Sequence, residues 1–477
     1  MEGVYTLIAF LEKINHFVWG VPTLILILGV GIYLSVRTGF AQIQLLPKAF
    51  SAFFGKLLSR ASDKEGVTSF QALCTALAAT VGIGNIVGVA GAIAIGGPGA
   101  VFWMWTCGVL GMITKYAEAT LAVHFQTKNK TGEVIGGPMY IISQGMPKYW
   151  NWMAGLYSFF GVIAAFGVGN ATQINAVIGS INGTLNFFGG SESRIGNLLM
   201  GIFLSVLISI MLLGGAKKIG NIAEKLVPFA AMLYLLLGMS VLWIRREFVF
   251  DALLLIARGA FSPKAVTGGL LGSGFVALRI GASRGVFTNE AGMGTAAIAH
   301  GSAKVTHPSE QGLMGIMEVF LDTILICTIT ALVILTSGIS IPYGNDMGGV
   351  LTIQAFSAVL GEWVSIPLAM AMCCFAIATV LGWGLYGARC AQYLLGDGVW
   401  KKFVFLQAIA VVAGAVLNTG TVWLLSEIVN GLMAAPNLIM LAWFSPLLIK
   451  LTKEYKNKEY SYKRVDNFNK YDKIIKK

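Results

Sequence analysis

The stretch Thr80-Val81-Gly82-Ile83-Gly84-Asn85 interrupts an apolar run that begins at Phe70 and resumes as far as Ile95. A glycine-rich turn, Gly96-Gly97-Pro98-Gly99, then leads into the next apolar run. Inside a membrane, each backbone group freed by such a break costs several kcal/mol unless protein, water or a ligand binds it. The stretch predicts either a discontinuous helix whose free N–H and C=O groups bind solute and ion, or a close contact between helices through small residues.

The composition around this stretch is that of a polytopic membrane protein. The chain has 477 residues, of which 56% are hydrophobic and only 12% charged, and no soluble domain of this size has that balance. The first apolar segment, residues 18–36, follows Glu2, Glu12 and Lys13 and precedes no small-residue cleavage site, so we expect a retained helix and not a signal peptide. The six cysteines lie in apolar segments without metal-site spacing, and we expect buried thiols.

The net charge of +12 raises the question of a nucleic-acid partner. Much of this charge lies in a lysine-rich C-terminal tail, residues 451–477, which is typical of a cytoplasmic segment that contacts anionic lipid. We therefore expect a lipid bilayer as the chain's surroundings, no nucleic-acid partner, and no obligate protein partner.

Apolar segments of membrane-spanning length recur along the whole chain, and we expect about eleven spans. Their ranges are 18–36, 70–95, 100–125, 150–181, 195–214, 219–244, 267–299, 312–337, 364–395, 403–417 and 421–450. Lys and Arg in the loops fall on one side if the N-terminus is outside and the C-terminus is in the cytoplasm of a plasma (inner) membrane. The basic loop 245–264 is an exception on the outer side, where we expect an interfacial helix at 248–258. We also expect amphipathic or re-entrant pieces at 47–58 and 136–140.

A second interruption lies in the segment 267–299, at Gly281-Ala282-Ser283-Arg284-Gly285 and Phe287-Thr288-Asn289-Glu290-Ala291-Gly292-Met293-Gly294. Without the first span, the two interruptions occupy the first and sixth spans, which are corresponding positions of two five-helix halves. An odd number of spans per half gives the halves opposite orientations, so their breaks meet near the membrane midplane. We divide the chain into an N-terminal helix and loop (1–69), a first repeat (70–244), an outer loop (245–266), a second repeat (267–450) and the tail (451–477).

The chemistry available at such a site is limited. The sequence has no His/Cys/Glu metal spacing, no credible Ser-His-Asp set and no phosphate loop, and Gly82-Ile83-Gly84 is a weak match to a nucleotide fingerprint. We therefore expect no enzyme, no catalytic residue and no cofactor. Backbone dipoles, amides and hydroxyls remain, and these suit a small zwitterion and an alkali cation.

Several motifs resemble the alanine or glycine:cation symporter family, the sodium:alanine symporters. They are spread from the second span to the ninth, so the resemblance covers nearly the whole chain apart from the tail. The motifs are Ala76 to Asn85, Gly96-Gly97-Pro98-Gly99-Ala100-Val101-Phe102-Trp103-Met104-Trp105, Gly136-Gly137-Pro138-Met139-Tyr140, Arg284 to Gly292, and Thr379-Val380-Leu381-Gly382-Trp383.

The resemblance implies a fold similar to the amino acid–polyamine–cation superfamily, which is all-α with a five-plus-five inverted repeat and one extra N-terminal helix. It also implies sodium-coupled uptake of alanine and glycine by alternating access. The residues alone leave open a proton-coupled carrier, a carrier for larger neutral amino acids, and an ion channel; the paired breaks and small-residue packing argue against a continuous pore.

Placed on these positions, helix-end physics assigns roles to individual residues. The substrate carboxylate is expected at the N–H groups of Gly84 and Asn85, and the ammonium at carbonyls freed around Phe287, Ala291 and Gly292. The other predicted substrate residues are Thr80, Gln173, Thr379 and Trp383. For Gln173 and Asn170 the alternative is an interhelix hydrogen bond, and for Trp383 and Phe287 it is ordinary packing.

The resemblance also implies one sodium ion between the first broken helix and the eighth core helix. Its expected ligands are the carbonyls of Ala78, Val81 and Ala376 and the hydroxyl of Thr379. Asp322 and Glu290 are intramembrane acids and hence candidates for function. For Glu290 a pairing with Arg284 or Arg279 is favoured, and Lys115 is expected to pair with Glu118, three residues along the same helix.

Overall fold

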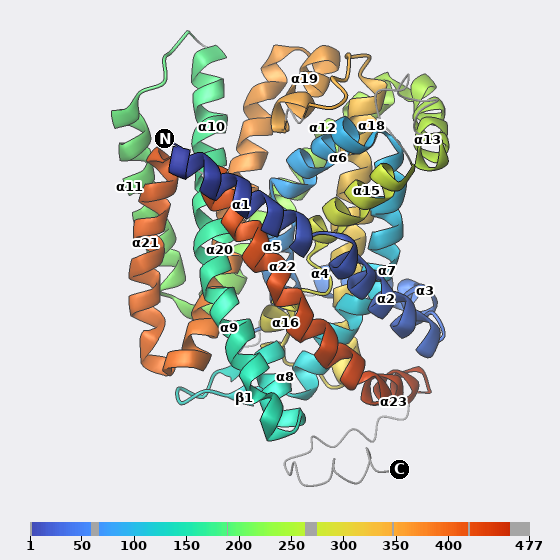
Figure 1. The fold of residues 1–477 in the computed structure, drawn as a ribbon, viewed down its shortest axis with the longest axis vertical. Coiled ribbons are helices and arrows are strands. Elements are labelled where there is room, and N and C mark those ends of the chain that lie inside the picture. Colours follow the sequence, from blue (N-terminus) through green and yellow to red (C-terminus); the bar gives the residue numbers. More distant parts are fainter. Residues whose placement is uncertain are drawn as a thin grey trace.

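The computed structural model describes residues 2–58, 66–187, 189–262, 274–345, 348–417 and 420–457. These residues are mostly helical, and the strands β1 (Thr127–Lys128) and β2 (Val134–Ile135) form one short antiparallel hairpin. Many of the long helices lie roughly along the vertical axis of Figure 1, whereas α1 (Glu2–Val18), α2 (Val21–Arg37) and α22 (Gly420–Trp443) cross it obliquely. Of the predicted tail, 451–477, residues 458–477 lie outside the described residues, and most of the remainder is helical.

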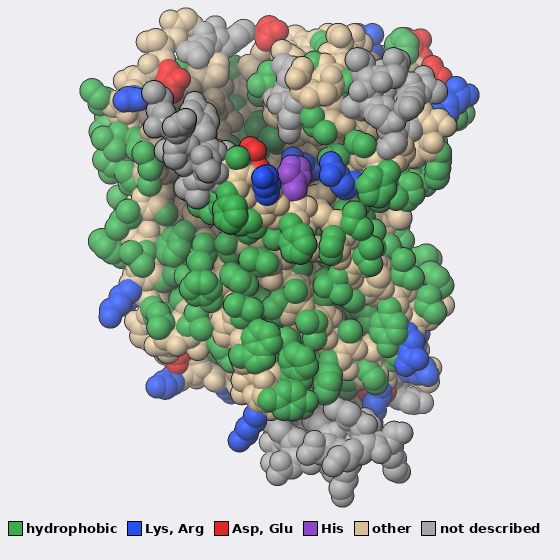
Figure 2. Space-filling view, viewed as in Figure 1, with side chains coloured by type: hydrophobic (Ala, Val, Ile, Leu, Met, Phe, Trp, Pro, Cys, Tyr) green, Lys and Arg blue, Asp and Glu red, His purple; other side chains and the backbone are tan. Residues whose placement is uncertain are grey.

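Eight helices in the described part of the chain are long and apolar enough to cross a membrane, and a bent pair makes a ninth. They account for nine of the predicted spans. The two other predicted spans are α7 (Gly99–His124), which carries Lys115 and Glu118, and the second interrupted helix. Hydrophobic side chains cover the middle of the face in Figure 2, which is the surface expected of a protein surrounded by lipid.

The first interrupted helix consists of α5 (Ser69–Thr80), the π-helical turn η1 (Gly84–Gly88) and α6 (Val89–Gly96), with a bend of 52°. A capping box between Thr68 and Gln71 satisfies two of the N–H groups at the start of α5. The helix ends at Thr80 because Val81 adopts an extended conformation. The predicted discontinuity is therefore present.

The second interrupted helix consists of α15 (Gly274–Asn289) and α16 (Thr295–His300). The linker contains three residues with positive φ, Glu290 at 52°, Gly292 at 94° and Gly294 at 76°. Glycine adopts this conformation without strain, whereas glutamate rarely does, so Glu290 marks a place where the surroundings hold the backbone. Residues 267–273 of the predicted span lie outside the described residues.

The interrupted helices are enclosed by long helices, several of which contain π-helical turns. The helix α7 packs against α15 and against α17 (Pro308–Val319), and α20 (Ser365–Leu395) packs against α5. The remaining long elements are α2 (Val21–Arg37), α9 (Asn151–Phe166), η3 (Gly167–Ala171), α10 (Thr172–Phe187), α11 (Arg194–Leu212), α12 (Gly215–Ile244), η4 (Phe320–Ile326), α18 (Cys327–Thr336), α21 (Trp400–Val416) and α22 (Gly420–Trp443). Such π-turns are rare and are frequent at functional sites.

Short helices gather at the two ends of the molecule. The β-hairpin, α8 (Pro138–Gly145) and α23 (Ser445–Lys456) lie at one end of Figure 1, and α13 (Arg246–Phe261) and α19 (Gly349–Leu360) at the other. Helices are found where amphipathic or interfacial pieces were predicted, namely α13, α8 and α4 (Leu46–Leu58). The other short elements are α1 (Glu2–Val18), α3 (Ala41–Gln44), η2 (Lys148–Trp150), η5 (Glu362–Val364) and η6 (Asp397–Val399).

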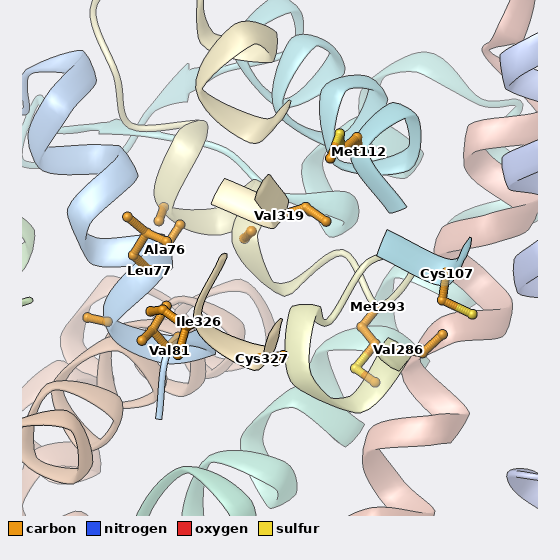
Figure 3. Packing of buried hydrophobic residues seen from close by; sticks show 14 of the residues in the cluster. Ala76, Leu77, Val81, Cys107, Met112, Val286, Met293, Val319, Ile326 and Cys327 are labelled. Atoms are coloured by element: carbon orange, nitrogen blue, oxygen red, sulfur yellow. The ribbon is translucent and has the colours of Figure 1, made fainter. Parts of the chain in front are cut away.

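The core has a large apolar cluster around the interrupted helices and a smaller one among α10, α11, α20 and α21. In Figure 3, Val81 lies beside Ile326, and Met293 lies beside Val286. Apolar packing therefore reaches the edges of both interruptions and leaves only a small polar space between them.

Candidate functional site

A small cavity lies between the two interrupted helices, α9–α10, α20 and α22. The space between its lining atoms, including the part that opens to solvent, is about 370 Å³. The lining residues are Ala79, Thr80, Gly82, Gly84, Val168, Gln173, Phe287, Glu290, Thr379, Trp383 and Asn430. Because most of these groups are polar or small, the cavity suits a compact polar solute.

At the first interruption, a side chain replaces the helix's own hydrogen bond. The N–H of Gly82 donates to Oδ1 of Asn85 at 3.0 Å, not to the carbonyl of Ala78 that a continuing helix would use. The Asn85 amide in turn donates to Oδ1 of Asp322 at 2.6 Å. Asn85 therefore holds the break open and ties it to η4.

The helix α20 approaches the same interruption closely. A Cβ atom added to Gly82 would lie 2.8 Å from the Thr379 hydroxyl oxygen, and one added to Gly382 would lie 2.9 Å from the backbone nitrogen of Ala79. The Thr379 hydroxyl donates to the carbonyl of Phe375 at 3.0 Å, which leaves its oxygen able to accept or to bind a cation. Glycines at 82 and 382 thus let this hydroxyl reach the broken end of α5.

At the second interruption, a buried carboxylate from α7 holds the linker. Oε1 of Glu118 accepts from the N–H groups of Gly292 at 2.9 Å and Gly294 at 3.1 Å, and from the Asn437 amide at 2.7 Å. Asn437 also donates to the carbonyl of Gly292 at 2.8 Å. The glycine side of this linker therefore faces α7 and α22.

Glu290 is the first residue of this linker, and it lines the cavity. One carboxylate oxygen accepts from the Thr295 hydroxyl at 2.6 Å and the other from the Trp383 indole at 3.2 Å. The pairing favoured from the sequence is wrong for Arg284, because that side chain lies 3.6 Å from Glu427 on α22 instead. In the described part of the chain, neither Arg284 nor Arg279 forms an ion pair with Glu290.

Aromatic rings and an amide complete the walls. Trp383 packs closely on η3. A Cβ atom added to Gly169 would lie 2.2 Å from the Cβ atom of Trp383. Phe287 lies 3.7 Å from the position of a Cβ at Gly84 and contacts Trp19 edge-on at 6.4 Å between ring centroids. Gln173 donates to the carbonyl of Val168, and its own Oε1 is buried without a hydrogen-bond partner in the described residues.

Comparison with known proteins identifies the family. The sequence model of the sodium:alanine symporter family matches residues 4–470. The chain belongs to this family. Its members are transporters that carry amino acids together with cations, so the chain is a multi-pass membrane protein of amino-acid:cation symport.

Two relatives and one solved structure show the extent of the similarity. The Sodium/alanine symporter AgcS of Methanococcus maripaludis is 40% identical over 455 residues, 94% of this chain and 97% of that protein. The "Probable sodium/glutamine symporter GlnT" of Bacillus subtilis is 34% identical, covering 92% of this chain and 89% of its own. The crystal structure of MhsT with L-phenylalanine superposes with a TM-score of 0.55 at 15% identity, over 82% of this chain and 99% of that one, and thus shows a shared fold.

The predicted site residues fall into three groups in this symporter. Thr80, Gly84, Gln173, Phe287, Thr379 and Trp383 line the cavity. The predicted sodium ligands Ala78, Val81 and Ala376 are buried near it. Asn85, Ala291 and Gly292 are not among the lining residues, because Asn85 binds Asp322 and Gly292 binds Glu118 and Asn437.

The sequence analysis missed Glu290 as a wall of the cavity and Asn430 altogether. An acid inside a glycine-rich break was a usable signal for Glu290. Asn430, in the middle of α22, gave no signal of its own. For Asn170 the interhelix alternative is confirmed, since its amide donates to the side chain and backbone carbonyl of Gln407.

A chain of buried charges lies behind the second interruption. Lys115 pairs with Glu318 at 2.9 Å, and the other oxygen of Glu318 lies 2.9 Å from Nε2 of His300. The predicted pairing of Lys115 with Glu118 is wrong, because the partner of Lys115 comes from α17 and not from its own helix. These fully buried groups compensate one another and do not line the cavity.

A second recess lies next to the cavity and shares Phe287 with it. It is lined by Asn15, His16, Trp19, Arg279, Ile280, Ser283, Arg284, Phe287 and Glu427, with an empty volume of about 640 Å³. In Figure 2, charged side chains gather in a hollow above the apolar belt. Phe287 therefore separates the small cavity from a polar entrance.

Proposed function

We propose that this protein is a sodium-coupled secondary active symporter that takes up small neutral amino acids, alanine and glycine, by alternating access. The observation that carries this proposal is the small polar cavity between two helix interruptions. Interrupted helices offer dipole ends to a zwitterion and freed carbonyls to a cation without needing ionisable side chains for either.

In the proposed complex, the substrate carboxylate binds at the N–H groups that open η1 near Gly84, where the helix dipole is positive. Gln173 offers an amide oxygen that is buried without a partner in the described residues. Trp383 and Phe287 bound the space and limit the side chain to a small one. Asn85, Ala291 and Gly292 act from behind this surface by holding the two breaks open.

The proposed sodium site lies between α5 and α20, with the carbonyls of Ala78, Val81 and Ala376 and the hydroxyl of Thr379 as ligands. The close approach of α20 to Gly82 supports this placement. Sodium bound there would join the first interrupted helix to α20 and so organise the neighbouring amino-acid site. Substrate binding would then favour closure of the outer side and rocking of one bundle against the other.

For the architecture we propose two five-helix repeats, residues 70–244 and 267–450, of opposite orientation after one extra N-terminal helix. The N-terminus would lie outside and the C-terminus in the cytoplasm of the plasma membrane. The Lys and Arg residues of the loops support this orientation. The position of α8 and α23 at one end and of α13 and α19 at the other agrees with it.

Two alternative functions are compatible with the same fold. One has a different transported amino acid, and the other has a different coupling ion. The similarity to a protein named as a glutamine symporter favours a larger neutral amino acid. The buried carboxyl of Asp322, bonded to the Asn85 amide and the Thr323 hydroxyl, favours coupling to protons.

Uptake of labelled alanine into liposomes containing the purified protein tests the proposal. We expect accumulation above equilibrium with an inward sodium gradient at fixed pH, and none when potassium replaces sodium. Uptake driven only by a pH gradient would refute sodium coupling, and sodium-driven uptake of glutamine without alanine would refute the small-substrate assignment.

The sodium site is tested separately by Thr379→Ala, which removes a proposed ligand, with Thr379→Ser as the matched control that keeps the hydroxyl. The alanine variant should require about 10-fold or more sodium for half-maximal uptake, because it loses one charge-assisted contact of about 1.5–3 kcal/mol. Its ranking of amino-acid substrates should stay the same. An unchanged sodium dependence would contradict the site.

A further inference from the structure

Glu290 is the one cavity-lining residue with an ionisable side chain, all lining residues being among those described. It is 4% exposed, and its carboxylate accepts two hydrogen bonds from neutral donors, the Thr295 hydroxyl and the Trp383 indole. In the described part of the chain, the ion pairs involve other carboxylates: Glu133, Glu318, Glu427 and Glu454. Glu290 thus lacks an internal counter-charge at contact distance.

A carboxylate buried in a membrane protein without a counter-charge is unfavourable by several kcal/mol. Its retention at the wall of a ligand cavity is explained if the cargo brings the positive charge. We propose that the carboxylate of Glu290 binds the α-ammonium group of the transported amino acid. This inference rests on the proposed function and deepens it. Of Phe287, Ala291 and Gly292, whose carbonyls were expected to bind the ammonium, Ala291 and Gly292 do not line the cavity.

The geometry around Glu290 supports this role in two ways. Each carboxylate oxygen has two acceptor positions, so after the bonds to Thr295 and Trp383 the group still has acceptor positions for an ammonium. Glu290 also follows the last turn of α15, where its own N–H donates to the carbonyl of Val286 at 2.8 Å. The negative end of that helix dipole adds to the attraction for a cation.

Across the cavity, η1 begins at Gly84 with the positive end of its dipole. A zwitterion therefore has one orientation that satisfies both ends, with its carboxylate at Gly84 and its ammonium at Glu290. The bonds from Thr295 and Trp383 hold the carboxylate in place, so Glu290 also fixes the ring that limits substrate size. The consequence is selection against carboxylic acids that lack an ammonium group, such as lactate and propionate.

The test compares competitors of labelled alanine uptake in liposomes containing wild-type protein or Glu290→Gln. In wild type, lactate should compete at least 100-fold more weakly than alanine. In Glu290→Gln, alanine should bind about 10- to 100-fold more weakly because a charge-assisted hydrogen bond is lost, whereas lactate should bind equally well or better. The selectivity for alanine over lactate should fall by about the same factor.

Glu118→Gln is the matched control, since it neutralises a buried carboxylate that holds the linker without lining the cavity. It should lower uptake yet keep the selectivity for alanine over lactate. If Glu290→Gln does not fold, Glu290→Asp is used, which retains the charge on a side chain one methylene shorter and should weaken alanine more than lactate.

The outcomes separate the inference from the function on which it rests. Selectivity that is unchanged in both Glu290 variants, with wild type transporting alanine, overturns the inference and leaves the symporter intact. If the Glu290 variants bind sodium much more weakly and keep the selectivity for alanine over lactate, the charge of Glu290 is balanced by sodium and not by the ammonium group. That result also overturns the inference. Wild-type protein that transports no amino acid refutes the proposed function first.

Discussion

The two helix interruptions are held open by different means. The first is anchored by the side-chain amide of Asn85. Its oxygen accepts a hydrogen bond from the Gly82 N–H, and its nitrogen donates one to Asp322. The second is anchored by a carboxylate, Glu118, which binds two N–H groups of the linker directly. One anchor is therefore neutral and lies on the broken helix itself, while the other is an acid from a neighbouring helix.

This difference decides what each interruption presents to the cavity. At the first break, Gly82 and Gly84 line the space, so the backbone of α5 and η1 is exposed to it. At the second break, the glycines face away toward Glu118 and Asn437, and the side chain of Glu290 lines the space instead. Backbone recognition on one side and side-chain recognition on the other is what two ends of a zwitterion require.

Glu118→Leu should break the second interruption completely. It leaves the N–H groups of Gly292 and Gly294 and the Asn437 amide buried without their acceptor, each at a cost of about 1–3 kcal/mol. The sum is comparable with the whole stability of many domains, so we expect little folded protein. Size-exclusion chromatography and thermal unfolding in detergent measure this; a folded, active Glu118→Leu would show that the linker needs no anchor.

Asn85→Asp should disrupt the structure of the first interruption by electrostatic repulsion. The new carboxylate would replace an amide that lies 2.6 Å from Asp322, so two acids would face each other in a buried site. We expect alanine uptake to fall about 100-fold or more. The exchanged pair Asn85→Asp with Asp322→Asn restores one amide and one acid and should recover much of the uptake; if the exchange recovers nothing, the connection between them is not the anchor.

Gly82→Ala should act mainly on the cation. Its Cβ would lie 2.8 Å from the Thr379 hydroxyl oxygen, closer than real Cβ contacts, so this proposed sodium ligand must shift away from the break. We expect about 10-fold more sodium for half-maximal uptake, with a maximal rate closer to wild type. The control is Gly179→Ala, whose Cβ would meet nothing within 4 Å. If Gly82→Ala and Gly179→Ala change the sodium dependence equally, the first interruption is not part of the sodium site.

Arg284→Gln lies outside both interruptions, in the polar entrance. The pair with Glu427 is partly exposed, with 30% and 15% of the side chains accessible, and such pairs contribute about 0–1 kcal/mol. We expect the KM for alanine to change less than about 5-fold, and less still at high salt. A change as large as that of Gly82→Ala would mean that the entrance takes part in binding.

The sequence predicted the first interruption and the part of the second that begins at Glu290, because glycines and polar residues stand inside apolar segments. Residues 281–289, predicted as part of the second interruption, are helical in α15. The sequence also predicted Thr80, Gly84 and Trp383, which line the cavity. It did not predict the partners of the buried charges. Lys115 and Glu118 are neighbours on one helix, but the ion pair of Lys115 is with Glu318, which lies 203 residues away.

The reversal of roles at Glu290 was also beyond the sequence. Whether Ala291 and Gly292 or Glu290 face the cavity depends on positive φ angles in the linker and on anchors from α7 and α22. Such tertiary contacts leave no trace in local composition. The same holds for Arg284, which was favoured as a partner of Glu290 and which instead pairs with Glu427 on α22.

The reciprocal binding of sodium and alanine, measured by isothermal titration calorimetry on the purified protein, tests the account most directly. If sodium organises the first interruption and thereby the amino-acid site, sodium should lower the Kd of alanine and alanine should lower the Kd of sodium by the same factor. In Thr379→Ala this factor should fall toward one. An alanine Kd that is the same in sodium as in potassium would contradict the account.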